Sequence, residues 1–185
     1  INSYILRSVY NNKVKHLIFP SCTVMYPSSK KATKESDFNG EIIDKYKGVG
    51  ETKVYIEKIS KFYSMQCDTK YTIIRHSNIY GPYDKYDLDR SHVFGATMTK
   101  VLTAKKRIEV WGTGNEIRDF LYADDLVNFI KIAINKQKTQ YEIFNCGSGI
   151  PIKVKDLVKK IIKISKKDII IQFNKKKPTI PFNMY

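Results

Sequence analysis

Residues 44–58, DKYKGVGETKVYIEK, contain two groups suited to a proton relay, a tyrosine and a lysine. The stretch is typical of a loop that leads into a helix, and Lys53 stands where a relay lysine on such a helix would stand. A lysine lowers the pKa of a phenol one helical turn earlier, because its positive charge favours the phenolate. That earlier position holds Val49, which cannot exchange a proton.

Tyr46 is the nearest tyrosine before Lys53, seven residues away. Gly48 and Gly50 lie between them, and their backbone freedom would let the loop fold back toward the lysine. We therefore expect Tyr46 to take over the relay. Two alternatives stay open: Tyr46 covers the core at an ordinary helix entrance, or the chain has lost the chemistry.

Three histidines and three cysteines are the other reactive side chains. They form no C-x-x-C pair and no histidine cluster, so the sequence predicts no metal site. An odd number of widely spaced cysteines predicts free thiols in a reducing compartment. These residues are His16, His76, His92, Cys22, Cys67 and Cys146.

The chain of 185 residues is 42% hydrophobic and 12% aromatic, which is typical of a globular protein with a core. No apolar run is long enough to span a bilayer and the first residues do not resemble a signal peptide, so we expect a cytoplasmic protein. The formal net charge of +15 suits a phosphorylated substrate. Nucleic-acid binding is the weakest hypothesis, because the lysines are spread over helical faces and are not grouped with aromatic residues.

Helix-like and strand-like segments alternate along the chain, which predicts parallel strands, crossover helices and hence an α/β fold. Asp124 or Asp125 is expected to cap the helix that begins at Leu126. The tail 178–185 contains two prolines and is expected to have no partner. The expected helices are 1–12, 50–66, 92–104, the one from 126 and 153–167, and the expected strands are 14–21, 70–81, 107–112 and 141–147.

Three short glycine motifs occur, GVG at 48–50, GTG at 112–114 and GSG at 147–149. None extends to G-x-G-x-x-G, and none follows a strand and opens a helix as a pyrophosphate-binding turn must. We therefore expect the sequence to be an internal fragment of a dinucleotide-binding fold.

Three motifs, in order, resemble those of the extended short-chain dehydrogenase/reductases that modify nucleotide sugars, the NAD-dependent epimerase/dehydratase family. They are VKHLIFPSCTVMYP, IIRHSNIYGPYD and VWGTGNEIRDFLYADDLV, and GPYDKYDLDRSHVFGATMTK is most similar to the GDP-L-fucose synthases within that family. The resemblance implies NAD or NADP as cofactor and a nucleotide-diphosphate sugar as substrate. It also implies hydride transfer at a sugar carbon by an epimerase, reductase or dehydratase.

The implied fold is a partial Rossmann-like parallel sheet with flanking helices, plus part of a smaller C-terminal substrate-binding region. Residues 1–82 are expected to form the C-terminal half of the dinucleotide-binding domain. Residues 83–185 are expected to mix the substrate-binding region with the last Rossmann strands and helices. The family dimerises through a four-helix bundle, so we expect a homodimer through helices 1–10 and 50–66, with Val54, Ile59 and Phe62 at useful spacing.

The resemblance also assigns roles on the catalytic and cofactor side. Lys53 matches the relay lysine that also holds the nicotinamide ribose. The catalytic hydroxyl is expected four residues before Tyr26, at Cys22, so Thr23 or Cys22 takes that role. Ser21 and His76 are the further candidates beside the cofactor, although His76, like His16, also has a purely structural interpretation.

On the substrate side, the resemblance assigns Asn78 and Arg118 to the diphosphate, because a guanidinium fork matches phosphate oxygens. A salt bridge from Arg118 to Asp119 or Asp124 is the structural interpretation. His92 matches an acid–base histidine for sugar inversion, whose cysteine partner falls on Val24 unless Cys22 stands in. Lys100 adds positive charge. Trp111 flanks the base or belongs to the core, and Tyr122 is expected in the core.

These observations support three hypotheses in order. The first is an NAD(P)-dependent nucleotide-sugar enzyme with an atypical relay. The second is a catalytically impaired family member that binds a nucleotide sugar without turnover. The third is a basic nucleic-acid-binding domain, which would show binding to duplex DNA that weakens steeply with salt.

Overall fold

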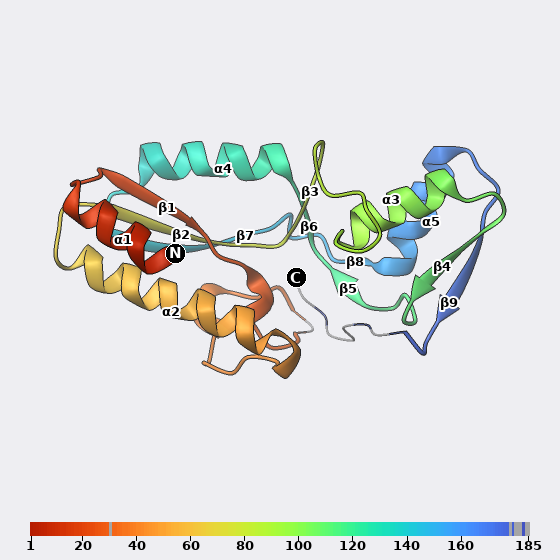
Figure 1. Cartoon of the computed structure of the whole chain (residues 1–185), viewed down its shortest axis with the longest axis horizontal. Helices are drawn as coiled ribbons and strands as arrows, with labels where there is room; N and C mark the ends of the chain where they lie inside the picture. The colour runs from red at the N-terminus through yellow and green to blue at the C-terminus, as the bar shows by residue number, and fades with distance from the viewer. Residues whose placement is uncertain (30, 178, 180–182, 184–185) are drawn as a thin grey trace.

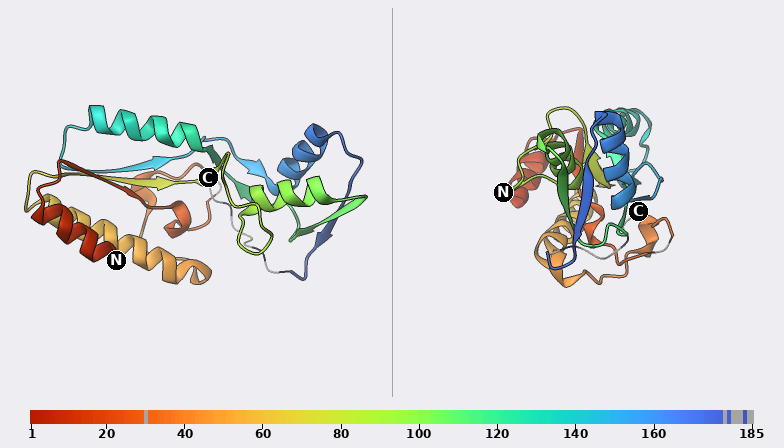
Figure 2. Two further views of the ribbon diagram at one scale, coloured as in Figure 1. Left: turned by 45° about the horizontal axis from the view of Figure 1, so that its top comes forward. Right: turned by 90° about the vertical axis from the view of Figure 1, so that its right-hand side faces the viewer.

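The first lobe of the molecule is a three-layer α/β unit. The computed structural model of the whole chain describes residues 1–29, 31–177, 179 and 183. A parallel sheet of order β1-β2-β7 lies between two helical layers (Figure 1). The strands are β1 (His16–Pro20), β2 (Lys70–His76) and β7 (Tyr141–Cys146). Helices α1 (Asn2–Asn11) and α2 (Lys47–Ser64) cover one face, and α4 (Ala123–Lys136) covers the other (Figure 2).

The central strand β2 is apolar on both faces because helices cover both. Successive side chains of a strand point to opposite faces. Tyr71 packs in the cluster with Leu6 and Ile56 from α1 and α2, whereas Ile74 packs with Leu121 and the residues of α4. The expected α/β class and Rossmann-like parallel sheet are thus confirmed.

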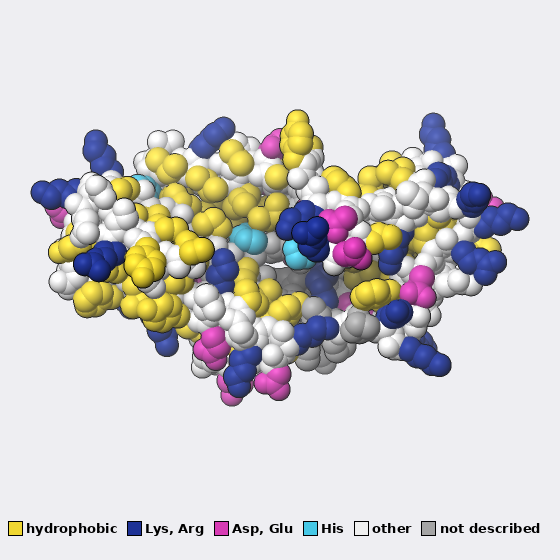
Figure 3. Space-filling view, viewed as in Figure 1, with side chains coloured by type: hydrophobic (Ala, Val, Ile, Leu, Met, Phe, Trp, Pro, Cys, Tyr) yellow, Lys and Arg dark blue, Asp and Glu magenta, His cyan; other side chains and the backbone are white. Residues whose placement is uncertain are grey.

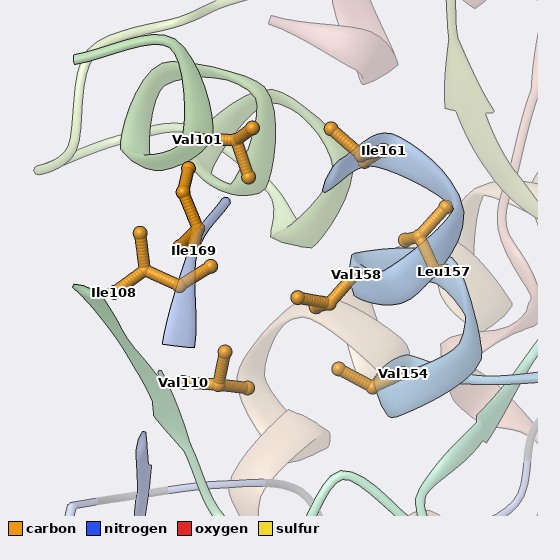
Figure 4. Close-up of a cluster of buried hydrophobic side chains, with 8 residues drawn as sticks. All are labelled: Val101, Ile108, Val110, Val154, Leu157, Val158, Ile161 and Ile169. Carbon is orange, nitrogen blue, oxygen red and sulfur yellow. The ribbon is translucent and has the colours of Figure 1, made fainter. Parts of the chain in front are cut away.

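The second lobe has its own core (Figure 4). It contains α3 (Val93–Thr103), α5 (Val154–Ser165) and the parallel pair β4 (Arg107–Trp111) and β9 (Ile170–Asn174). Eight aliphatic side chains are buried together, from Val101 on α3 to Ile169 before β9. Each such side chain stabilises the fold by roughly 1.5–3 kcal/mol when removed from water.

Short elements connect the lobes near their junction. β3 (Asn78–Tyr80) pairs in parallel with β6 (Phe120–Tyr122), and β5 (Ile117–Arg118) pairs antiparallel with β8 (Ile152–Lys153). Three single turns of 3₁₀ helix, η1 (Thr23–Met25), η2 (Glu35–Asp37) and η3 (Asp44–Tyr46), lie between β1 and α2. β5, β6, β8 and β9 were not expected, since segments of two to five residues carry little periodicity.

The segment 70–81 is two strands in different sheets, and not the single strand expected. β2 ends at His76 because no neighbouring strand continues past it: β1 ends where Pro20 pairs with Ile74, and β7 ends where Cys146 pairs with His76. The chain then leaves the sheet and forms β3. This break places the residues after His76 at the junction of the lobes.

Two helices begin earlier than expected. α2 begins at Lys47, so Gly48 and Gly50 lie inside the helix and do not form a free loop. A Cβ at Gly50 would stand 2.7 Å from the side chain of Ile42, so this glycine permits close packing. α4 begins at Ala123 without a side-chain cap. Asp124 and Asp125 therefore lie in the first turn, where their negative charges interact favourably with the helix dipole and stabilise the helix.

The tail has contacts that the sequence did not predict. The Asn183 backbone N–H donates to the Ser28 hydroxyl at 3.1 Å, and the Asn183 amide oxygen accepts from the Ile117 N–H at 3.3 Å. The other residues of the expected tail, apart from Thr179, lie outside the described part. Cys22, Cys67 and Cys146 are free thiols, as expected. Across the described chain, no helix has the length and hydropathy that a bilayer-spanning segment requires.

Candidate active site

A cleft lies at the junction of the lobes, where Figure 3 shows a hollow with histidine and basic side chains around it. It consists of a larger pocket of about 680 Å³ and a smaller pocket of about 590 Å³. Both pockets are lined by Tyr46, Asn78, His92 and Arg118, so they form one continuous space, which we call the central cleft. These four residues come from four separate segments of the chain.

Lys53 lies on α2 beside the carboxyl end of β1. Its ammonium donates a hydrogen bond to the Pro20 carbonyl at 2.8 Å and stands 4.8 Å from the centroid of the Phe19 ring. Val49, one turn earlier, lines the smaller pocket and is 47% exposed. A valine thus stands in the pocket at the position where the relay would place a phenol.

Tyr46 is half-buried and lines both pockets. Burial raises the pKa of its phenol, while the charge of Arg118 opposes this and the thiolate of Cys22 would add to it. Arg118 is therefore the cation that favours the phenolate of Tyr46. The recruitment of Tyr46 stays a prediction, with Arg118 as its electrostatic neighbour.

A buried polar network ties α2 to the sheet. The Ser21 hydroxyl donates to the Glu57 carboxylate at 2.6 Å, and the Arg75 guanidinium forms a 2.7 Å salt bridge with the same carboxylate. Arg75 also donates to the Tyr26 hydroxyl at 2.6 Å. Ser21 is fully buried and its hydroxyl is bonded to Glu57, so its contact with the cofactor stays a prediction. Ser21 and Glu57 fix the helix that carries Lys53.

Cys22 and Thr23 line the smaller pocket just after β1. Burial raises the pKa of the Cys22 thiol, which therefore stays protonated at neutral pH. The Thr23 hydroxyl forms no hydrogen bond within the described chain, so it is available to a ligand. Thr23 is the better hydrogen-bond donor of the two.

Two histidines line the smaller pocket from different lobes. The His76 ring nitrogen Nδ1 lies 2.8 Å from the Ser77 carbonyl oxygen. Burial lowers the pKa of His76, the positive charges of Lys53 and His92 lower it further, and the hydrogen bond to Ser77 opposes this. His92 is exposed and immediately precedes α3. His16 lies elsewhere, with its Nε2 atom 2.7 Å from the Thr72 hydroxyl.

Asn78 and Arg118 lie at the boundary of the two pockets. The Asn78 amide donates to the Asp119 carbonyl at 3.0 Å, which fixes its orientation. Arg118 is 9% exposed and donates to the Ile117 carbonyl at 2.7 Å. Burial lowers the pKa of its guanidinium, while Tyr46 and Glu116 oppose this.

The larger pocket ends in a basic and aromatic wall. The Lys100 ammonium donates to the Glu109 carbonyl at 2.9 Å and lies 5.6 Å from the Trp111 ring centroid. Burial lowers the pKa of Lys100, against the charge of Glu109. Trp111 is 46% exposed and lines this pocket, so it is not a core residue. Tyr122 does not line the central cleft but packs behind it against Tyr80, with ring centroids 5.5 Å apart.

Asp119 holds the turn at residues 148–149 in place, a role that the sequence did not predict. Its buried carboxylate accepts hydrogen bonds from the Ser148 and Gly149 backbone N–H groups at 2.9 and 2.8 Å. A Cβ at Gly147 would stand 2.6 Å from the same carboxylate. The sequence contains both partners, since Asp119 lies in the third family motif and residues 147–149 form the GSG motif. The sequence alone does not show that the two segments contact each other.

A family model described as NAD dependent epimerase/dehydratase family matches residues 1–147. This chain belongs to that family, as its motifs indicated. Among curated relatives, GDP-L-colitose synthase of Yersinia pseudotuberculosis is 28% identical over 181 residues, which is 94% of this chain and 59% of the relative. GDP-L-fucose synthase of Escherichia coli (strain K12) is 25% identical over 178 residues, which is 89% of this chain and 56% of the relative.

Solved structures share the fold. A GDP-6-OMe-4-keto-L-xylo-heptose reductase from C. jejuni superposes with a TM-score of 0.88 at 21% identity, over 100% of this chain and 66% of that one. A UDP-glucose 4-epimerase from Thermotoga maritima superposes with a TM-score of 0.83 at 23% identity, over 94% of this chain and 55% of that one. The chain thus spans between half and two thirds of the length of these relatives.

Proposed function

We propose that this chain forms the substrate-binding and proton-transfer part of an NAD(P)-dependent nucleotide-sugar epimerase, reductase or dehydratase. The observation that carries the proposal is the convergence of Tyr46, Asn78, His92 and Arg118 on one cleft between two lobes. The family membership and the names of the relatives, which include GDP-sugar synthases and a 4-keto-heptose reductase, support the same class.

The substrate in this proposal is a nucleotide-diphosphate sugar. Arg118 pairs with the diphosphate through its guanidinium fork, and Asn78 lies beside it. Lys100 adds charge at the far end of the larger pocket, where the half-exposed Trp111 ring provides a flat surface for the base. The sugar then occupies the smaller pocket, between His76 and His92.

The cofactor in this proposal is NAD or NADP, which supplies or accepts the hydride when bound. Lys53 fits the nicotinamide ribose, because its ammonium stands at the carboxyl end of a parallel strand and its charge acts on both Cys22 and His76. Tyr46 exchanges the proton on the sugar oxygen, and Thr23 or Cys22 hydrogen-bonds to that oxygen. Arg118 supports this role, because its charge favours the phenolate of Tyr46.

A family member that binds nucleotide sugars without turnover is the second candidate. Val49 favours it, because a half-exposed valine stands in the smaller pocket where the relay phenol would lie. The two candidates share the substrate cleft. They differ only in whether hydride reaches the sugar.

We further propose a cytoplasmic homodimer that assembles through α1 and α2. Figure 3 shows hydrophobic side chains gathered over these helices, and Tyr4, Tyr55 and Phe62 are 78%, 51% and 51% exposed. Val54 is not available to a partner, because it is 8% exposed and packs with Met25 and Tyr26. We also propose that the chain divides after residue 82 into a dinucleotide-binding part, 1–82, and a mixed part, 83–185. Within the second part, α4 and β7 return to the first lobe.

Titration calorimetry of residues 1–185 with a GDP-linked sugar tests the substrate cleft. Arg118→Met should weaken binding tenfold or more, on the order of the 1.5–3 kcal/mol that a charged hydrogen bond contributes. Arg107→Met is the matched control, because Arg107 is exposed on β4 and does not line the cleft. Equal affinity in both variants, or no binding by the unmodified chain, would contradict the proposal.

A further inference from the structure

The smaller pocket contains a half-buried titratable group for which the proposed hydride transfer has no use. His76 ends β2 in the first lobe, and His92 precedes α3 in the second lobe. Both line the smaller pocket, and the charge of His92 lowers the pKa of His76. A sugar ring in the smaller pocket would therefore lie beside both lobes, with His76 on the first and His92 on the second.

The hydrogen bond of His76 fixes which nitrogen carries its proton. A carbonyl oxygen can only accept, so Nδ1 must donate its hydrogen to the Ser77 carbonyl, 2.8 Å away. The neutral ring then carries its lone pair on Nε2, on the opposite side of the imidazole. Nε2 forms no hydrogen bond with any residue that the structure describes. His76 is thus held as a base with an available lone pair in the pocket.

We propose that His76 is a catalytic acid–base residue that works with His92 to invert a sugar carbon next to a keto group. This inference rests on the proposed nucleotide-sugar function and adds a step to it. In that step, Nε2 of one neutral histidine removes the proton from the carbon, so the C–H bond breaks, an N–H bond forms and the electron pair becomes an enolate on the keto oxygen. The other histidine, as imidazolium, returns a proton to the opposite face of the carbon, and water restores the two protonation states.

Cys22 is the other candidate for the second acid–base group, and its environment disfavours it. A cysteine acts as a base only as a thiolate. Burial raises the pKa of the Cys22 thiol, so the thiolate is scarce at neutral pH. His76, by contrast, is neutral there and needs no activation, because burial and the positive neighbours Lys53 and His92 lower its pKa.

The charges around His76 set the direction of its pH dependence. Lys53 faces it from α2, and His92 faces it from the loop before α3. The other ionisable residues that line the pocket are Cys22, Tyr46, Tyr80, Tyr83, Asp84 and Arg118. Because the pKa of His76 lies below its ordinary value of 6.5, the base is present above that pH. Exchange should fall as the pH drops below 6.5 toward the lowered pKa.

Deuterium exchange tests the step without any dinucleotide, because the keto group of the substrate already activates the neighbouring carbon. Residues 1–185 are incubated in D₂O with a 4-keto-6-deoxy sugar linked to GDP, and NMR follows deuterium at the carbons beside the ketone. His76→Asn keeps a donor for the Ser77 carbonyl but removes the base. This variant and His92→Asn should slow exchange about a hundredfold or more, the scale of a lost general acid or base. His16→Asn is the matched control, since His16 lies outside the pocket.

Each outcome separates the inference from the proposed function. If the unmodified chain does not bind the keto sugar by calorimetry, the proposed function fails and the inference with it. If the sugar binds but no exchange exceeds the protein-free rate, or if His76→Asn exchanges normally, only the inference is overturned. Exchange lost in Cys22→Ser but retained in His76→Asn would also overturn it. If His76→Asn unfolds, His76→Gln and the pH profile of the unmodified chain take its place.

Discussion

Breaking the buried ion pair between Glu57 and Arg75 should destabilise the protein strongly. The two groups are 2.7 Å apart, and both side chains are 5% exposed. Glu57 also accepts from Ser21, and Arg75 also donates to Tyr26. Glu57→Ala would leave a buried guanidinium without its counter-charge, which costs about 3–5 kcal/mol.

Thermal unfolding followed by circular dichroism measures this loss. For a chain of this size each kcal/mol lowers Tm by roughly 2–4 °C, so Glu57→Ala should lower Tm by roughly 6–20 °C. Glu51→Ala is the matched control, because Glu51 is an exposed carboxylate on the same helix, and it should change stability by less than about 0.5 kcal/mol. The double variant Glu57→Leu with Arg75→Met should lose less than the sum of the single losses, because no charge is left unpaired.

The reasoning would be refuted if Glu57→Ala lost less than about 1 kcal/mol, or no more than Glu51→Ala, because a buried charge would then tolerate isolation at little cost. The consequence for the site is also measurable. Since Glu57 holds α2 on Ser21 at the end of β1, its loss should weaken nucleotide-sugar binding even below the melting transition.

The remaining predictions concern the relay, the assembly and the response to pH. In the natural polypeptide that carries these residues, Tyr46→Phe should lower turnover about a hundredfold or more and Val49→Tyr should add little; unchanged turnover in Tyr46→Phe would end the recruitment idea. Light scattering at micromolar concentration should give a dimer that Phe62→Lys with Tyr55→Lys converts to monomer, and a monomeric unmodified chain would contradict the proposed interface. Burial and the charge of Lys70 lower the pKa of His16 below its ordinary 6.5, so the contribution of His16 to stability is present above that pH and is lost as the pH falls below it. NMR titration of His16 should give a midpoint under 6.5. On acidification, the free energy of unfolding measured in urea should fall less in His16→Asn than in the unmodified chain.

The α/β class and the long elements could be predicted because periodicity over ten or more residues is a strong signal. α1, α3 and α5 lie where their apolar spacing placed them. The break between β2 and β3 could not be predicted, because it depends on where β1 and β7 end and not on the local sequence. The role of Gly50 was misjudged for the same reason, since the side chain that it accommodates, Ile42, meets it only in the fold.

For the candidate site, too, the sequence located residues but could not show the contacts between them. The motifs located Asn78, His92 and Arg118, and the spacing to Lys53 located Tyr46. The fold brings all four to one cleft. Spacing could not show that Ser21 points into the core, because one residue along a strand reverses the face. Nor could it show that His76 and His92 line one pocket, because they come from different lobes.

Deuteride transfer is the most direct test of the central claim that these residues serve hydride chemistry on a nucleotide sugar. The natural polypeptide that contains residues 1–185 is supplied with a 4-keto nucleotide sugar and a nicotinamide cofactor deuterated at its transferable position. We expect deuterium on the former keto carbon of the product, and a loss of about a hundredfold or more in the rate of transfer in Lys53→Met. A nucleotide sugar that binds the cleft but gains no deuterium from the cofactor would contradict this claim.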